Sequence, residues 1–250
     1  MPILEVNRLK KYFPVRGGIF LRRTGWVYAV DDVSFSVKKG ETFGLVGESG
    51  CGKTTLGRCI MGLHDMTGGS VKVLDQTIFA LSSGQKKTLS SHLQMIFQDP
   101  YESLDPRQTV RQILEEKYRI HGKHSGELPA VIGRLLDDVG LSKDSLDKYP
   151  HEFSGWQRQR IGIARAVSMN PEIIICDEPV SALDVSVQSK ILNLLLTLQQ
   201  TMGLTYVFIS HDLSVVRHVS DRIGVMYLGK LVEMADAQNV YDHARHPYTR

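Results

Sequence analysis

The amino-acid sequence predicts an α/β fold, made of a core around a phosphate-binding loop, an antiparallel β subdomain and an inserted α-helical subdomain. Three patterns support this prediction. A glycine-rich loop lies between a buried strand and a helix at 42–61, the stretch 110–169 is helical in pattern, and buried strands alternate with helices again after it. The chain has 250 residues, enough for one large domain. We expect this domain to comprise 1–98, the first part of the core with the antiparallel strands; 99–169, the helical subdomain; and 170–250, the second part of the core.

The first part of the chain predicts half-buried antiparallel strands. Apolar and polar residues alternate over 3–9 and again over 33–37, and a period of two is that of a strand with one buried face. The glycines of 17–25 predict an inserted loop or hairpin between these runs. A further pair of strands is expected around 71–78.

The most informative pattern is G-x-x-x-x-G-K-[ST] directly after a strand-like run. The strand is 42–46, and the residues from Thr55 to Met61 predict the helix that follows. This context of strand, loop and helix is what distinguishes a phosphate-binding loop from a chance match. With Thr55, the candidate nucleotide-binding residues are Gly47, Glu48, Ser49, Gly50, Cys51, Gly52, Lys53 and Thr54.

The chemistry of this loop suits a nucleoside triphosphate. Glycines let backbone N–H groups converge on a phosphate, and the positive end of the helix dipole favours the anion. Lys53 is predicted to reach the β- and γ-phosphates, and the hydroxyl of Thr54 to bind Mg²⁺. The alternative, a glycine-rich loop that binds nothing, does not account for the strand and helix on either side of it.

The middle of the chain changes from strands to helices. Residues 93–97 predict a strand, and 110–169 a helical region with polar loops at 121–125 and 142–150. Apolar residues at 128–139 follow the i, i+3, i+4, i+7 rule, which gives one buried face.

The last part predicts strands and helices in alternation. The run 173–175 is β-branched without alternation, which is typical of a parallel strand covered on both faces. We expect an amphipathic helix at 185–200, a second buried strand at 206–209, a short helix at 213–219, and a hairpin at 222–234 that turns at Gly229 and Lys230.

Two acidic residues close the strand that precedes them. Asp177 and Glu178 follow 173–175 at the carboxyl end of that strand, the edge where ligands bind in open α/β sheets. We expect Asp177 to bind Mg²⁺ through water and Glu178 to act as the general base. A plain surface turn is the alternative.

Two further polar residues end predicted strands. His211 follows 206–209 and is predicted to reach the γ-phosphate, although a residue there can also be an ordinary neighbour of a helix cap. Gln98 ends the strand at 93–97, and its amide is expected to bridge the metal and the attacking water.

Composition excludes several classes of protein. The formal net charge of +3 is too small to indicate a nucleic-acid partner. Three cysteines form no metal-like pair and suit a reducing compartment. The N-terminus does not resemble a signal peptide, and no apolar run approaches the length that spans a bilayer. We therefore expect a cytosolic protein that contacts a membrane only through a partner.

Five motifs follow one another in a fixed order: the loop Gly47–Thr54, Gln98, Ser154–Gln157, Asp177–Glu178 with Ser181–Asp184, and His211. This order resembles that of the nucleotide-binding subunit of ABC transporters, over essentially the whole chain. The resemblance implies the ABC ATPase fold, with ATP and Mg²⁺ bound. It also implies that Ser154, Gly155 and Gln157 bind the γ-phosphate of ATP held by a second subunit, identical or paralogous, in a head-to-tail dimer. Ser154 is a good N-cap for a helix ending near 170.

Two segments narrow the resemblance to the ATPases of dipeptide and oligopeptide importers: 97–107 and 246–250. It implies ATP hydrolysis that drives uptake through membrane permease subunits, at the cytoplasmic face of the membrane. An extracytoplasmic solute-binding protein would take part indirectly. It further implies that 101–107 faces the permease, and that Phe13, or its neighbour Tyr12, stacks on adenine.

The chain departs from the family pattern at two places. Trp156 stands where the family has a second glycine, and a left-handed backbone angle there would disfavour tryptophan. The chain also ends at the segment 246–250, whereas peptide-importer ATPases usually continue, so it is either a piece of a longer protein or a naturally short member.

The sequence is compatible with two other functions. One is an ABC-type ATPase of a soluble assembly, such as the phosphonate-cleaving lyase complex, whose motifs are very similar. The other is a DNA-repair ATPase of the same superfamily. The lack of a long coiled-coil insertion before Ser154 and of a basic face argues against the second.

Overall fold

The computed structural model describes residues 1–17, 22–122 and 126–250. The chain divides into two compact units, and each is described by itself. The first unit comprises Met1–Lys86 and Thr205–Arg250, and the second comprises Lys87–Leu204.

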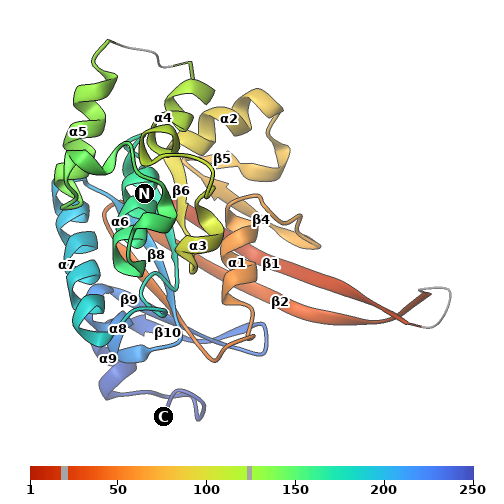
Figure 1. Ribbon diagram of the computed structural model, residues 1–250. Helices are drawn as coiled ribbons and strands as arrows, with labels where there is room; N and C mark the ends of the chain where they lie inside the picture. The colour runs from red at the N-terminus through yellow and green to blue at the C-terminus, as the bar shows by residue number, and fades with distance from the viewer. Residues whose placement is uncertain (18–21, 123–125) are drawn as a thin grey trace. The chain divides into compact units, whose positions relative to one another are not determined.

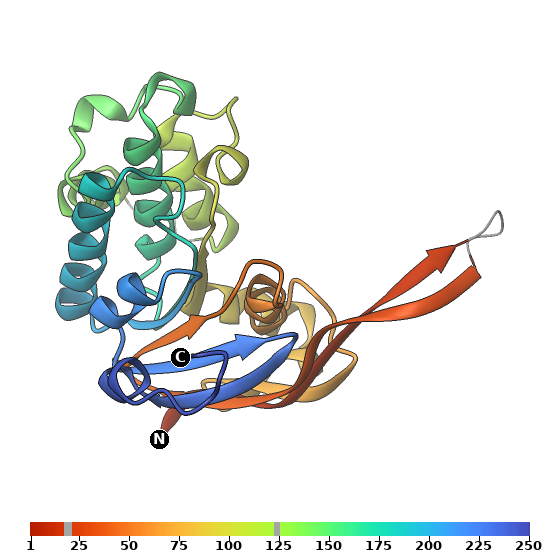
Figure 2. The same ribbon diagram turned by 90° about the horizontal axis from the view of Figure 1, so that it is seen from below.

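An antiparallel sheet in the order β2-β1-β4-β5 forms one part of the first unit. Its strands are β1 (Pro2–Gly17), β2 (Arg22–Lys38), β4 (Gly68–Val73) and β5 (Gln76–Thr77). Leu4, Val6 and Leu9 are buried, as their alternation predicts. β1 and β2 form one long ribbon whose last described pair is Gly17 with Arg22 (Figures 1 and 2). The two strands on either side of the predicted loop or hairpin are therefore paired, and residues 18–21 lie outside the described residues.

Parallel strands form the other part of the first unit. β3 (Thr42–Val46) lies between β8 (Thr205–Ser210) and β9 (Arg222–Tyr227) and is parallel to both, and β10 (Lys230–Asp236) pairs with β9 in an antiparallel manner. Every residue of β3 and β8 is buried, as expected for strands covered on both faces. Because Val46 pairs with Ser210, the two strands end at the same edge.

Short helices follow these strands. The helices are α1 (Lys53–Ile60), α8 (Leu213–Val219) and α9 (Ala237–Asp242), with a 3-10 turn at Ile78–Ala80. α1 begins two residues before the predicted start, and α9 was not predicted. The β9–β10 turn falls at Leu228 and Gly229, one residue earlier than predicted, because both residues have positive φ angles (46° and 80°), as a two-residue hairpin turn requires.

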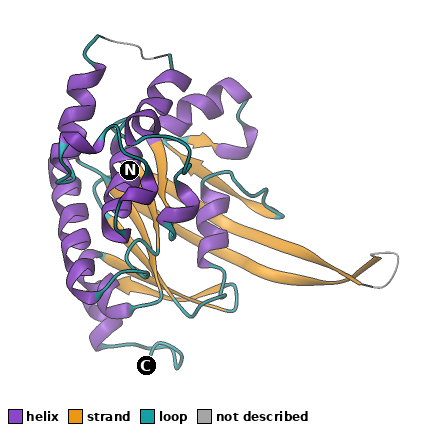
Figure 3. Ribbon diagram, viewed as in Figure 1, coloured by secondary structure: helices purple, strands orange, loops and turns teal. Residues whose placement is uncertain are grey.

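The second unit contains a parallel pair of strands and most of the helices (Figure 3). β6 (Leu93–Ile96) pairs in parallel with β7 (Ile173–Asp177), and Ile96 lies opposite Cys176. Between these strands the described residues contain no strand, as the pattern of 110–169 predicts. The helices are α3 (Pro100–Ser103), α4 (Val110–Ile120), α5 (Leu128–Asp138), α6 (Gly155–Val167) and α7 (Val185–Met202), with 3-10 turns at Lys143–Ser145 and Pro150–Glu152.

Local sequence explains the helix boundaries of this unit. Thr109 caps α4, because its hydroxyl accepts a hydrogen bond from the backbone N–H of Gln112 and the Gln112 side chain bonds back to the N–H of Thr109. α7 ends at Gly203, whose φ of 68° is a left-handed angle. A further helix, α2 (Ser83–His92), contains the point in the chain where the first unit ends and the second begins. The sequence does not predict it, since Leu89 is its one buried residue and gives no helical period.

Candidate nucleotide-binding site

Two glycines allow the phosphate loop to lie directly against neighbouring backbone. A Cβ atom on Gly52 would stand 1.9 Å from the carbonyl oxygen of Ala29 in β2, and one on Gly47 would stand 2.1 Å from that of Met226 in β9. Gly52 also has a φ of 109°. No residue with a side chain fits at these positions. The loop is therefore shaped by backbone contacts on both sides within the first unit.

Lys53 lies inside the loop that precedes it. Its side chain is buried, with 3% exposed, and its Nζ donates hydrogen bonds to the carbonyl oxygens of Gly47 (2.7 Å) and Glu48 (2.8 Å). Both partners are neutral, so the positive charge of the ammonium is available to an anion. The loop thus combines an ammonium, backbone N–H groups and the N-terminus of α1, which is a donor set that fits the phosphates of a nucleotide.

Two contacts to this loop come from parts of the chain that sequence reasoning did not connect with it. The backbone N–H of Gly229, in the β9–β10 turn, donates to the carbonyl of Cys51 at 3.0 Å. The backbone N–H of Glu48 donates to the hydroxyl of Tyr248 at 2.8 Å. The segment 246–250 carries a family resemblance in its sequence, but no local pattern indicates where it packs.

His211 lies at the same edge of the first unit as the phosphate loop. It follows β8 directly, and the pairing of Val46 with Ser210 places it level with Gly47. Its side chain is exposed. The strand order therefore brings His211 to the loop's edge, as the sequence predicts.

The second unit brings Gln98 and Glu178 together. The Nε2 of Gln98 donates a hydrogen bond to the Oε2 of Glu178 at 3.3 Å. The two residues follow paired strands, β6 and β7, at the same carboxyl end. Asp177 and Glu178 are buried, and Glu178 has a φ of 46°, in the left-handed region. Its carbonyl oxygen accepts a hydrogen bond from the Oγ of Ser181 at 3.1 Å, which holds the turn.

The predicted Mg²⁺ ligands do not form a metal site made of protein side chains alone. Among the described residues, no group of three or more His, Cys, Asp and Glu side chains is arranged to hold a metal. Mg²⁺ commonly takes one or two protein ligands and completes its shell with phosphate oxygens and water. Thr54, in the first unit, and Gln98 and Asp177, in the second, each carry an oxygen donor of the type that Mg²⁺ accepts, and their role as ligands stays a prediction.

Ser154 is the N-cap of α6, as predicted, and its exposed side chain is oriented by Gln157. The Oε1 of Gln157 accepts hydrogen bonds from the backbone N–H and the Oγ of Ser154, both at 3.0 Å. Trp156 lies in the first helical turn with 38% of its surface exposed, and the guanidinium of Arg160 stands 5.2 Å from its ring centroid. Trp156 has no positive φ angle, so the helix carries tryptophan here without backbone strain.

Both candidate adenine-stacking rings have neighbours within the first unit. Phe13 packs edge-on against His64 with ring centroids 5.8 Å apart, and the Nζ of Lys11 lies 4.7 Å from its centroid. The hydroxyl of Tyr12 donates to Asp31 at 2.6 Å, and this hydrogen bond raises the pKa of Tyr12 to about 12. Stacking on adenine stays a prediction for Phe13.

Known proteins resemble this chain over much or all of its length. A family model described as ABC transporter matches residues 30–181. The chain is 54% identical to the oligopeptide transport ATP-binding protein AppF of Bacillus subtilis (strain 168), over 99% of this chain and 76% of that protein. It is 52% identical to the glutathione import ATP-binding protein GsiA of Salmonella paratyphi A, over 100% of this chain and 40% of that protein.

Two solved structures are similar over nearly the whole chain. One is cbiO1 of Clostridium perfringens, part of the transporter complex cbiONQ, with a TM-score of 0.82 and 25% identity over 97% of this chain and 91% of that chain. The other is the ATP-binding cassette MJ0796, a dimer in a post-hydrolysis state bound to ADP and Pi, with a TM-score of 0.80 and 29% identity over 94% of this chain and 98% of that chain.

The helices of the described residues were also compared with the length and hydrophobicity of a membrane span. None of them is both long and apolar enough to cross a bilayer.

Proposed function

The chain belongs to the ABC transporter family, and we propose that it is the ATP-hydrolysing subunit of an importer for peptides or a related solute. The observation that carries the proposal is the buried ammonium of Lys53, held by the carbonyls of Gly47 and Glu48 in a glycine-framed loop. The identity of half or more to oligopeptide and glutathione import ATPases supports the class of solute.

In this proposal the loop residues from Gly47 to Thr55 bind the phosphates of ATP, with Lys53 at the β- and γ-phosphates. Thr54, Gln98 and Asp177 would hold Mg²⁺, whose charge offsets the negative charge that develops on the phosphate oxygens. Glu178 accepts the proton of the attacking water, and Gln98 orients the carboxylate through the hydrogen bond described above. His211 contacts the γ-phosphate.

Ser154, Gly155 and Gln157 serve the ATP bound by a second subunit. The N-terminus of α6 presents backbone N–H groups and an exposed Ser154, which favours a phosphate. The structure of MJ0796, a dimer bound to ADP and Pi, supports a nucleotide-bound dimer for this chain as well. The partner is a second copy or a paralogue, and each ATP then lies between one chain's Lys53 and the other chain's Ser154.

The remaining assignments follow from the family. We propose that 99–169 forms the helical subdomain, within a single ATPase domain that also comprises 1–98 and 170–250, and that the segment 101–107 faces the permease. The chain would then lie at the cytoplasmic face of the membrane, peripheral to the permease. The solute-binding protein acts on it only through the permease, and no nucleic acid takes part.

Co-purification tests the proposal. The tagged chain is expressed with the genes that surround its own, and membranes and soluble extract are purified separately. We expect it to be recovered from membranes with permease subunits, and its ATPase activity in liposomes to rise when the binding protein carries a peptide. Recovery with soluble enzymes alone, as in a phosphonate-lyase assembly, would overturn the importer assignment.

A further inference from the structure

One peptide unit of the phosphate loop is hydrogen-bonded at both ends. The carbonyl oxygen of Gly47 accepts a hydrogen bond from the Nζ of Lys53 at 2.7 Å, and the N–H of Glu48, in the same peptide unit, donates to the Tyr248 hydroxyl at 2.8 Å. Because a trans peptide is planar, its C=O and N–H point in opposite directions and turn together. The hydroxyl of Tyr248 therefore sets the orientation of the carbonyl that holds Lys53.

The ring of Tyr248 is held in turn by its surroundings. It packs on the ring of Tyr227 in β9, with centroids 4.3 Å apart and planes tilted by 36°. Its backbone N–H donates to the Nδ1 of His246 at 3.2 Å. Burial raises the pKa of the Tyr248 hydroxyl, which therefore stays protonated and neutral at physiological pH. The hydroxyl is thus a fixed acceptor for Glu48.

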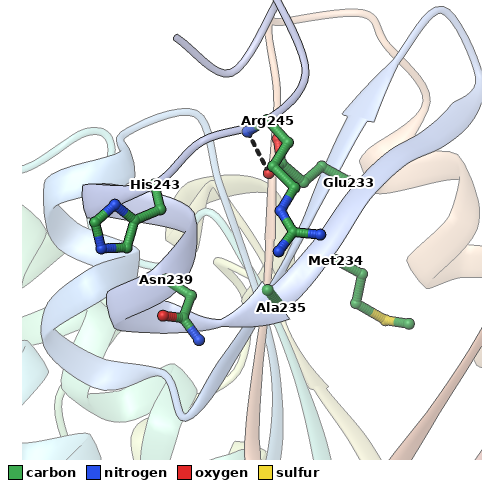
Figure 4. Close-up of a pocket in the computed structure, with 6 residues that line it drawn as sticks. All are labelled: Glu233, Met234, Ala235, Asn239, His243 and Arg245. Atoms are coloured by element: carbon green, nitrogen blue, oxygen red, sulfur yellow. Dashed lines mark hydrogen bonds between the residues drawn. The ribbon is translucent and has the colours of Figure 1, made fainter.

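A carboxylate of β10 anchors the segment that carries Tyr248. The Oε1 of Glu233 accepts a hydrogen bond from the backbone N–H of Arg245 at 2.8 Å, and its Oε2 accepts one from that of His246 at 3.1 Å. Figure 4 shows Glu233 and Arg245 joined in this way beside the pocket between β10 and α9. Both oxygens of one carboxylate are used for the segment, so its path is defined two residues before Tyr248.

We propose that Tyr248 is a positioning residue for nucleotide binding, which acts through the Gly47–Glu48 peptide unit to hold the ammonium of Lys53 in place. The contacts run from Glu233 through the segment 245–248 to the phosphate loop, entirely within the first unit. The inference rests on the proposed function, because it gives Tyr248 a part in binding ATP. Its hydrogen bond to Glu48 can be measured without nucleotide.

The first measurement is ATP affinity in Tyr248→Phe, which keeps the ring and removes the hydroxyl. We expect the Kd for ATP to rise about three- to tenfold, as the loss of one net hydrogen bond implies, while kcat at saturating ATP is unchanged. Tyr227→Phe is the matched control, since it removes a hydroxyl from the same ring pair and leaves the bond to Glu48 in place; its affinity should not change.

Two further measurements separate positioning from general destabilisation. In a Lys53→Ala background the effect of Tyr248→Phe on affinity should disappear, because residues that act through one another are not additive. Without nucleotide, hydrogen exchange at the backbone amide of Glu48 should be faster in Tyr248→Phe than in the unmodified chain. The two chains are compared under conditions in which their melting temperatures are equal, so that a global loss of stability does not account for the difference.

Unchanged affinity in Tyr248→Phe, or an equal effect with and without Lys53, would overturn the inference. So would unchanged exchange at Glu48. A chain that binds no ATP in any form would instead overturn the proposed function, and the exchange rate of Glu48 would still decide whether Tyr248 holds the loop.

Discussion

The side-chain amide of Gln98 donates a hydrogen bond to the carboxylate of Glu178, with 3.3 Å between Nε2 and Oε2. The two residues are far apart in sequence, and the parallel pairing of β6 with β7 brings them to one edge. Glu178 also holds a left-handed backbone angle, with a φ of 46°, which costs a residue with a side chain about 1–2 kcal/mol. Strained backbone angles of this kind are typical of residues at functional sites.

Replacement of Gln98 tests its predicted link to the metal. Gln98→Ala removes one proposed Mg²⁺ ligand and the donor that orients Glu178, so we expect kcat to fall about tenfold or more. The Mg²⁺ concentration that gives half-maximal activity should rise as well. Steady-state kinetics over a Mg²⁺ titration measure both quantities. An unchanged Mg²⁺ requirement would remove Gln98 from the metal site and leave it only the orientation of Glu178.

Charge reversal at Arg107 tests the predicted contact with the permease. Its side chain is 87% exposed and pairs with Asp105 at 3.0 Å, and an exposed ion pair contributes little to stability. Arg107→Glu should therefore lower permease-stimulated ATPase activity without changing ATP affinity. Arg111→Glu is the control, because Arg111 pairs with the exposed Asp147 in the same way and lies outside 101–107. Full stimulation of Arg107→Glu would show that this residue does not couple to the permease.

Trp156 tests whether the departure from the family pattern slows hydrolysis. Its angle is not strained, so any penalty comes from the exposed ring beside Ser154. In the assembled dimer we expect both Trp156→Ala and Trp156→Gly to raise turnover, by about tenfold for each 1.4 kcal/mol recovered. The alanine variant controls for the added flexibility of glycine. Equal turnover in all three chains would mean that the ring points away from the partner's ATP.

The stability of the second unit should depend on pH through Lys117. Burial, with the charge of Arg165 close by, lowers the pKa of Lys117 from 10.5 to about 7, while Glu116 acts in the opposite direction. The Lys117 Nζ donates to the backbone carbonyl of Arg165 at 2.7 Å and to the Oε1 of Gln94. The structure thus places this amine against neutral acceptors and a like charge.

The sign of this dependence follows from the lowered pKa. Between pH 7 and 10.5 the unfolded chain binds a proton at Lys117 that the folded chain does not, so stability should rise with pH over that window and level off below it. Urea unfolding at a series of pH values measures the slope. Lys117→Met keeps the stem and removes the amine, so the difference in slope between the two chains isolates this residue. Parallel curves for both chains would contradict the assignment.

Much of the site could be predicted from sequence because its signals are local. The phosphate loop lies between a buried strand and a helix, and Asp177, Glu178 and His211 each follow a continuous apolar run. Two paired parallel strands end at the same edge of their sheet, so the residues that follow them lie close together. The position of Ser154 at a helix start is also predictable from local sequence, since serine is one of the few residue types preferred at N-caps.

The remaining features depend on contacts that no local pattern encodes. Tyr248 meets Glu48 across 200 residues of chain, and nothing in either segment indicates the other. α2 buries Leu89 alone, so its sequence has no helical period to detect. The contacts of Tyr12 and Phe13 are equally non-local, which is why the sequence left both as candidates for adenine stacking.

The measurement that tests the central claim most directly is single-turnover hydrolysis by Glu178→Gln, together with its state of association. If Glu178 is the base, ATP should still bind while hydrolysis falls about a hundredfold or more, since a positioned base contributes about that much. The bound ATP should then hold two chains together, and sedimentation should detect a dimer with ATP but not with ADP. Near-normal turnover, or a monomer at saturating ATP, would contradict the account.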